Sequence, residues 1–127
     1  MVSGLIKIGL VFCVLIALMV IAVVVFATSL PEEKNYDEFA QCLTDKGLKM
    51  YGSVYCGHCN AQKRMFGSSW EYIDNAECTS QYGGQTEECV EAGIRAYPTW
   101  VLPDGTQLLG EQSFEKLSEL SGCPLPA

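Results

Sequence analysis

The chain begins with a long unbroken apolar run and then changes to short segments in which apolar and polar positions alternate. The twenty residues from Ile8 to Ala27 contain no charged or strongly polar side chain. A helix rises about 1.5 Å per residue, so a run of this length spans roughly the 30 Å hydrocarbon core of a bilayer. The pattern predicts one transmembrane helix within an N-terminal anchor, residues 1–27.

The charges on either side of the run predict its orientation. Lys7 precedes the run, whereas Glu32 and Glu33 follow it. Because positive flanks stay in the cytoplasm, we expect a cytoplasmic N-terminus and an extracytosolic domain, in the periplasm or at the cell surface. A cleaved signal peptide is the alternative, since small residues such as Ala27 and Ser29 suit cleavage. The run exceeds the usual signal-peptide core of about 7–15 residues, which favours a retained anchor.

Residues 28–35 are short and polar with one proline, so we interpret them as a linker to a domain that covers residues 36–127. In that domain, helical spacing of apolar residues predicts helices, and short apolar runs predict strands. The expected helices are 36–46, 56–67, 86–92 and 113–121, and the expected strands are 48–54, 72–78, 99–102 and 106–109.

The order of these elements predicts the fold class. Strands joined through a helix favour a parallel pair, while Pro103, Asp104 and Gly105 predict a hairpin between the last two strands. We therefore expect an α/β fold, with a mixed four-stranded sheet and flanking helices, preceded by the transmembrane helix.

The length and the net charge of the chain exclude several classes of function. The chain has 127 residues, which leaves about one hundred after the apolar run, enough for one small domain. Seven basic and fifteen acidic residues follow the run, a net charge of 7 − 15 = −8. A surface this negative repels phosphate, so we expect no nucleic-acid partner. The composition also excludes a multidomain enzyme.

Cysteine usage points to an oxidising compartment. Of seven cysteines, six follow the apolar run, and an even number outside the membrane fits an exported domain with disulfides. Six cysteines can pair in many ways, so the sequence does not fix the connectivity. Cys13 lies within the apolar run, where it acts as a small apolar side chain.

Two cysteines form a C-x-x-C motif, Cys56-Gly57-His58-Cys59, at the start of a predicted helix. The unpaired backbone N–H groups and positive dipole end of a helix stabilise a thiolate at Cys56, and a thiolate is the form that attacks a disulfide. Cys59, one turn later and further inside, is expected to stay protonated until it resolves the mixed disulfide. A protonated His58 would also stabilise the Cys56 thiolate, and its alternative interpretation is an exposed polar loop residue.

Other uses of a C-x-x-C motif fit this chain less well. Covalent haem attachment needs a histidine directly after the second cysteine, where the chain has Asn60. Structural zinc needs four ligands, and there is no second C-x-x-C motif, although Cys78 or Cys89 could complete a site. A purely structural bridge across two residues stabilises little. We expect no metal, and no cofactor beyond the redox-active disulfide.

The second candidate motif is Tyr97-Pro98-Thr99, directly before a predicted strand. Proline cannot donate to a strand ladder, so its place at a strand start suggests a tight bend with a cis peptide bond. Beside a C-x-x-C helix, this bend would place the Tyr97 backbone near Cys56, where it can pair with an extended substrate segment.

The succession of buried strand, C-G-H-C helix, Tyr97-Pro98-Thr99 and terminal hairpin resembles a thioredoxin-fold oxidoreductase, with the tetrapeptide typical of protein disulfide isomerases. Within residues 36–123, further segments resemble the thioredoxin-like domain that is fused to, or encoded as a partner of, bacterial vitamin K epoxide reductase (VKOR) homologues. These segments are FAQCLT at 39–44, MYG at 50–52, CNAQK at 59–63, EC at 77–78, residues 89–93 and YPTW at 97–100.

The resemblance implies that Cys56 attacks, Cys59 resolves and Pro98 is the cis-proline. It also implies a donor of disulfides to exported cysteine-containing proteins, reoxidised by a VKOR-like integral membrane protein that passes electrons to a quinone. Two positions depart from the pattern. Thioredoxins and isomerases bury an acid six residues before the first cysteine, where this chain has Met50, and many VKOR-linked domains carry proline in place of His58. A single apolar run cannot hold the multi-helix VKOR quinone site, so we expect that core in a separate partner.

The remaining cysteines admit two structural bridges. Cys78 and Cys89 flank a predicted loop and are interpreted as a structural disulfide, with a second redox pair as the alternative. Cys42 and Cys123 are assigned to each other mostly by elimination, and both can instead be free buried thiols.

The sequence therefore supports three hypotheses. The first is a membrane-anchored thiol–disulfide oxidoreductase that oxidises or isomerises exported proteins. The second is a reductase that draws electrons across the membrane. The third is a noncatalytic thioredoxin-fold binding module whose cysteines are all structural.

Overall fold

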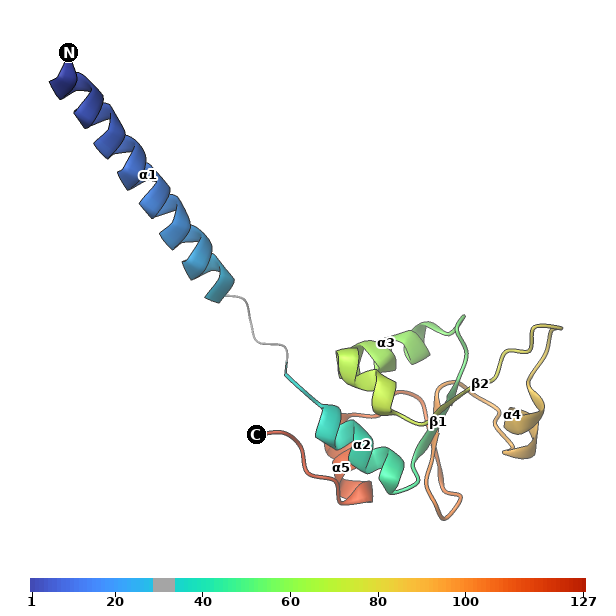
Figure 1. Cartoon of the computed structure of the whole chain (residues 1–127). Coiled ribbons are helices and arrows are strands. Elements are labelled where there is room, and N and C mark those ends of the chain that lie inside the picture. The colour runs from blue at the N-terminus through green and yellow to red at the C-terminus, as the bar shows by residue number, and fades with distance from the viewer. Residues whose placement is uncertain (29–33) are drawn as a thin grey trace. The chain divides into compact units, whose positions relative to one another are not determined.

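The computed structural model describes residues 1–28 and 34–127, and the chain divides into two compact units, Met1–Glu33 and Lys34–Ala127 (Figure 1). The predicted linker, residues 28–35, lies mostly outside the described residues. The same holds for Ser29, Glu32 and Glu33, on which part of the orientation and cleavage argument rests.

In its described part, the first unit consists of helix α1 (Val2–Thr28), which has 27 residues. At about 1.5 Å per residue it is ~40 Å long, more than the hydrocarbon core requires. None of its side chains is buried within the unit. By length and composition α1 can cross a membrane, and as an N-terminal helix it also fits a signal sequence.

The second unit is built on a four-stranded sheet in the order β2-β1-β3-β4. Strand β1 (Lys49–Gly52) pairs in parallel with β2 (Asn75–Glu77) and antiparallel with β3 (Thr99–Val101). The edge strand β4 (Gln107–Leu109) pairs antiparallel with β3. Together with the helices on the sheet, this confirms the predicted α/β class with a mixed four-stranded sheet.

Consecutive residues of β1 and β3 point to opposite faces of the sheet and enter two separate cores. On one face, Met50 and Trp100 join the larger core. Helices α2 (Asp37–Asp45), α3 (Gly57–Phe66) and α5 (Phe114–Ser121) supply its other side through an aromatic cluster. The rings of Phe39, Phe66 and Phe114 lie 4.6 to 6.2 Å apart, centroid to centroid.

On the other face, the residues that alternate with these pack against a smaller core. Tyr51 of β1 and Val101 of β3 contact it, and α4 (Glu87–Glu91) covers it. Its buried members are Ala76, Cys78, Cys89 and Ile94. The C-x-x-C motif lies at the start of α3, so it belongs to the layer that covers the larger core.

The strand predicted at 72–78 is shorter in the structure. Residues Gly67–Tyr72 form a 3-10 helix, η1, and only Asn75–Glu77 are in β2. Gly67 ends α3 at φ +57°, a backbone conformation that favours glycine. The buried Ser69 hydroxyl then donates to Asp37 at 2.6 Å, which holds η1 against α2. This contact joins residues far apart in the chain, so the local pattern does not contain it.

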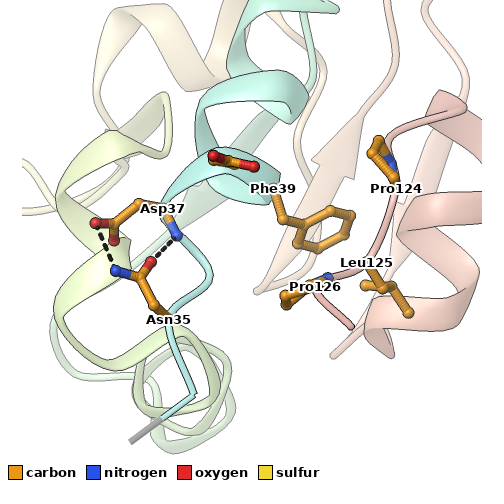
Figure 2. A pocket seen from close by; sticks show the side chains of 7 residues that line it. Asn35, Asp37, Phe39, Pro124, Leu125 and Pro126 are labelled. Atoms are coloured by element: carbon orange, nitrogen blue, oxygen red, sulfur yellow. Dashed lines mark hydrogen bonds between the residues drawn. The ribbon is translucent and has the colours of Figure 1, made fainter.

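A pocket of about 410 Å³ opens between the start of α2 and the C-terminal tail, residues 124–126 (Figure 2). Asn35 shapes its polar side, because its side chain accepts from the Asp37 N–H at 2.7 Å and donates to the Asp37 carboxylate at 3.1 Å. Neither Cys56 nor Cys59 lines this pocket, so it is separate from the redox motif.

Two disulfides fasten the second unit. Cys42 of α2 is bonded to Cys123 after α5, across 81 residues, and their Cα atoms lie 5.8 Å apart. Cys78 after β2 is bonded to Cys89 of α4, across 11 residues, with 5.6 Å between the Cα atoms. The first bridge therefore joins a helix to a segment that is distant in the sequence, and the second joins a helix to a nearby segment.

Loss of the Cys42–Cys123 bridge should destabilise the protein more than loss of Cys78–Cys89, because the longer loop constrains the unfolded chain more. The chain-entropy relation gives about 4–5 kcal/mol for the long loop and about 2–3 kcal/mol for the short one. Alanine substitution of each pair, followed by guanidinium unfolding in detergent, measures both losses. A larger loss for the Cys78→Ala/Cys89→Ala variant would contradict this.

Candidate thiol–disulfide site

The site is created where β1 ends and α3 begins. After Gly52, four residues turn the chain into α3, and Cys56 is the N-cap in an extended conformation, with φ −90° and ψ 116°. Its sulfur accepts the backbone N–H of Cys59 at 3.2 Å. A sulfur here replaces the oxygen of the usual N-cap side chains and satisfies one of the unpaired N–H groups of the helix.

Ser53 organises the turn that carries Cys56. Its carbonyl oxygen accepts the Cys56 N–H at 3.0 Å, and its hydroxyl oxygen accepts the Tyr55 N–H at 3.2 Å. The Ser53 hydroxyl also shares a 2.6 Å hydrogen bond with the hydroxyl of Thr79. The turn is thus fixed from within and from the loop that follows β2.

The two cysteines of the motif differ in exposure. Cys56 is partly exposed at the helix end, whereas Cys59 is completely buried and belongs to the larger core. Gly52 makes room for the Cys59 side chain, because a Cβ atom at Gly52 would lie only 3.1 Å from the Cys59 sulfur. The absence of a side chain at position 52 is therefore a packing requirement of the buried Cys59 side chain.

Burial raises the pKa of the Cys59 thiol from 9.0 to about 11, and its hydrogen bond with Cys56 acts in the same direction. The backbone of Ser53 acts in the opposite direction and lowers the pKa of Cys59. Cys59 is therefore a neutral thiol at physiological pH, as the sequence predicts. The sulfur of Cys56 is accessible for attack on a disulfide, whereas the buried sulfur of Cys59 keeps its proton. Thiol–disulfide exchange requires one thiol of each kind.

His58, on the first turn of α3, is hydrogen-bonded to Glu111. Its Nδ1 atom lies 2.6 Å from the Glu111 carboxylate, and its side chain is 80% exposed. The predicted role of His58 is to stabilise the Cys56 thiolate, and the carboxylate beside it offsets part of the charge that it brings. Gly57, the first residue of α3, is exposed, and a Cβ atom at this position would meet no other atom within 4 Å.

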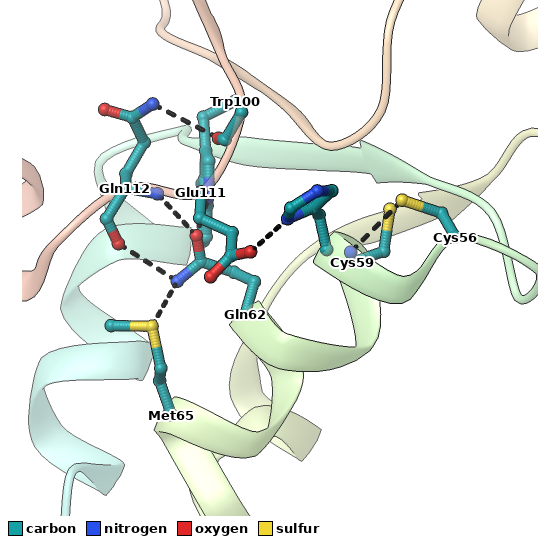
Figure 3. A network of polar contacts seen from close by, with 9 residues as sticks. Cys56, Cys59, Gln62, Met65, Trp100, Glu111 and Gln112 are labelled. Carbon is teal, nitrogen blue, oxygen red and sulfur yellow. Dashed lines mark hydrogen bonds and ion pairs between the residues drawn. The ribbon is translucent and has the colours of Figure 1, made fainter.

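A buried amide attaches the Glu111 loop to α3 (Figure 3). Gln62, one turn after His58, is fully buried. Its Oε1 atom accepts the Gln112 N–H at 2.7 Å and the Trp100 indole N–H at 3.2 Å, and its Nε2 donates to the Gln112 carbonyl at 3.1 Å. Because the Gln62 amide is fully paired, burying it costs little, and the loop that carries Glu111 is held against the redox helix.

The Tyr97–Pro98 peptide bond is cis, at the start of β3. Pro98 is buried, and its carbonyl accepts the Gly110 N–H at 2.8 Å. Tyr97 is half-buried, with its hydroxyl held by Gln85 at 2.8 Å. Thr99 is completely buried, and its hydroxyl donates to the Ala96 carbonyl.

The other cysteines of this unit are bonded as pairs. Cys78 and Cys89 are bonded to each other, and so are Cys42 and Cys123. Cys78 and Cys89 are the residues that the sequence analysis considered as further zinc ligands. Among the described residues the free cysteines are Cys13, Cys56 and Cys59. The C-x-x-C pair is thus the free dithiol of the second unit.

The sequence analysis gives no role in the site to three residues: Ser53, Gln62 and Glu111. Gln62 alone left a local signal, because it lies three residues after Cys59 and four before Phe66, on the buried face of a predicted helix. A glutamine among apolar positions indicates a polar partner from another segment. Glu111 and Ser53 depend on contacts across the chain.

Comparison with known proteins finds a relative of known activity. The thiol-disulfide oxidoreductase LTO1 of Arabidopsis thaliana is 36% identical to this chain over 91 residues. The alignment covers 68% of this chain and 24% of LTO1, so the chain spans about a quarter of the length of this curated relative. No protein-family model matches. Over the aligned part, the chain is a homologue of a thiol–disulfide oxidoreductase.

The Cys59 thiol should resist ionisation well beyond the pH at which an exposed cysteine loses its proton. A raised pKa of an acid means that the neutral form persists as the pH rises, here through 9.0 and up to about 11. The 13Cβ shift of Cys59 in the Cys56→Ser variant, followed by NMR in detergent, measures this without its coupled neighbour. Because burial is the main cause, the midpoint should stay above 9.0 in this variant, and a midpoint at or below 9.0 would refute the assignment.

Proposed function

We propose that the chain is a membrane-anchored thiol–disulfide oxidoreductase that acts outside the cytosol on exported cysteine-containing proteins. The single observation that carries this proposal is the asymmetry of the motif, in which Cys56 caps α3 at the surface and Cys59 is buried one turn later. Homology to a thiol-disulfide oxidoreductase supports it.

In this function the motif cycles between a disulfide and a dithiol. In the oxidising direction, a substrate thiolate attacks the Cys56 sulfur of the Cys56–Cys59 disulfide, and Cys59 leaves with the bonding electron pair and takes up a proton. A second substrate thiolate then attacks the substrate sulfur of the mixed disulfide and releases Cys56 as the thiolate. The substrate gains a disulfide, and the protein holds two thiols. Tyr97 and Pro98 would line the path of the substrate backbone.

The membrane helix supports the proposed location and the proposed partner. An N-terminal anchor keeps the domain near the bilayer, where a VKOR-like membrane quinone reductase can reoxidise the Cys56–Cys59 dithiol. The resemblance of segments such as 39–44 and 59–63 to VKOR-linked domains favours this partner. The reductase direction uses the same atoms in reverse.

The noncatalytic alternative is less well supported. It requires all six cysteines of the second unit to be structural. Four of them form two disulfides, however, and Cys56 and Cys59 are not bonded. A partly exposed sulfur on a helix N-terminus has no structural task that serine would not perform equally well as an N-cap.

A Cys59→Ser variant of the full chain should accumulate mixed disulfides with exported proteins, because Cys56 can still attack but nothing within the chain resolves the product. Membranes are treated with acid to stop thiol exchange, and the free thiols are then alkylated. Nonreducing electrophoresis detects the adducts, and a reductant should remove them.

The matched control is Cys56→Ser, which keeps the buried cysteine and removes the accessible one. It should trap few adducts or none. Equal trapping by the two variants, or none by Cys59→Ser, would argue for the noncatalytic alternative.

A further inference from the structure

We propose that Gln85 is a positioning residue for substrate binding, because its side chain holds Tyr97 in the orientation in which the Tyr97 backbone pairs with an extended cysteine-containing segment. The proposal rests on the proposed function and deepens it, since it gives the loop between Cys78 and Cys89 a part in substrate selection. This loop then acts on peptide substrates and not on small thiols, which have no peptide backbone to bind.

The backbone of Tyr97 is available for pairing. Tyr97 directly precedes the cis peptide bond to Pro98 and lies just outside β3. Among the described residues, no hydrogen bond uses the N–H or the carbonyl group of Tyr97, whereas the Pro98 carbonyl is already paired with the Gly110 N–H. An unpaired donor and acceptor beside the end of a strand are the groups to which an extended segment can bind.

The side chain of Tyr97 is anchored in the domain. Its ring is half-buried and packs against both cores. Its hydroxyl accepts from the Gln85 Nε2 at 2.8 Å, and the same nitrogen donates to the Ile94 carbonyl at 2.9 Å. Because the far end of the ring is held, the Tyr97 backbone keeps one orientation before a substrate arrives, and this lowers the entropy cost of binding.

The loop that presents Gln85 is closed at its neck. Thr79 and Gln85 face each other in an antiparallel bridge. Directly outside this bridge, the Thr86 N–H donates to the Cys78 carbonyl at 3.0 Å, and the Cys78 sulfur is bonded to Cys89. Gln85 is therefore held by contacts on the loop itself, independently of Tyr97.

The same neck reaches the turn that carries Cys56. The Thr79 hydroxyl shares a 2.6 Å hydrogen bond with the Ser53 hydroxyl, and the Ser53 carbonyl accepts the Cys56 N–H at 3.0 Å. Gln85, which faces Thr79, contacts Tyr97. One pair of facing residues thus connects the turn of the attacking cysteine to the segment that binds the substrate.

The chemistry separates binding from exchange. A peptide with two thiols and a small dithiol both transfer two electrons and two protons to the Cys56–Cys59 disulfide, and each leaves as a disulfide. The peptide also binds along Tyr97, whereas the small dithiol meets only the sulfur atoms. Loss of the hydrogen bond between Gln85 and Tyr97 should therefore weaken peptide binding and leave the exchange step unchanged.

The test uses the full-length chain in detergent, oxidised at Cys56 and Cys59 with glutathione disulfide, which is then removed. It is mixed with excess dithiothreitol, or with an unstructured peptide of about ten residues that contains two reduced cysteines. Acid quenching, alkylation and mass spectrometry follow reduction of the pair. We expect Gln85→Leu to raise the half-saturating peptide concentration about fivefold, the loss typical of one hydrogen bond. The maximal rate with peptide and the rate with dithiothreitol should stay unchanged.

Tyr97→Phe removes the other partner of the same hydrogen bond and keeps the ring. It should raise the half-saturating peptide concentration by a similar factor. The Gln85→Leu/Tyr97→Phe double variant should raise it no further, because both changes remove one shared interaction.

Gln107→Leu is the matched control. The Gln107 Nε2 also donates to a backbone carbonyl, that of Ala92 at 3.0 Å, but this contact does not involve Tyr97. The control should behave as the wild-type chain does with both substrates.

Four results would each overturn the role of Gln85. These are an unchanged half-saturating concentration in Gln85→Leu, an equal rise in Gln107→Leu, an equal loss of rate with dithiothreitol in Gln85→Leu, and additive losses in the double variant. If the wild-type chain oxidises the peptide no faster than the same concentration of glutathione disulfide does, the proposed function itself fails, which is a result distinct from these four.

Discussion

The hydrogen bond from the Cys59 N–H to the Cys56 sulfur is the interaction on which the site depends, because it makes a cysteine the N-cap of α3. A helix that begins at this point places its next three residues in one turn. That turn fixes the second sulfur a short way inside the first. The unequal exposure of Cys56 and Cys59 is thus a consequence of where the helix starts, and the raised pKa of Cys59 follows from its burial.

The rest of the domain keeps that turn in place. Strand β1 delivers the chain to the turn, and Gly52 leaves space for the inner sulfur. The Gln62 amide fixes the loop that carries Glu111, so the histidine of the motif has a partner. The Cys78–Cys89 bridge lies on the other face of the sheet, yet it reaches the site through Thr79 and Ser53. The two disulfides and the free Cys56–Cys59 pair are therefore parts of one connected arrangement.

The local sequence pattern predicts the parts of this fold that local contacts determine. The α/β class, the four helices of the domain and the cysteine at a helix start follow from apolar spacing and glycine stops, with boundaries within a few residues of those observed. The 3-10 helix after Gly67 was not predicted, because its stability comes from Ser69 bonded to Asp37, more than thirty residues earlier. For the same reason the roles of Ser53 and Glu111 appear only when distant segments are brought together. Gln62 could be predicted in part. A polar side chain on an apolar helix face indicates a hydrogen-bond partner, but the local pattern does not identify that partner.

Redox titration of the full-length chain tests the central claim most directly. The chain is equilibrated in glutathione buffers of increasing reducing strength, alkylated and analysed by peptide mass spectrometry. The account predicts a single two-electron transition in which Cys56 and Cys59 become alkylated together, while Cys42, Cys123, Cys78 and Cys89 stay bonded throughout. Reduction of either other pair before the Cys56–Cys59 pair, or a Cys56–Cys59 pair that never forms a disulfide, would contradict it.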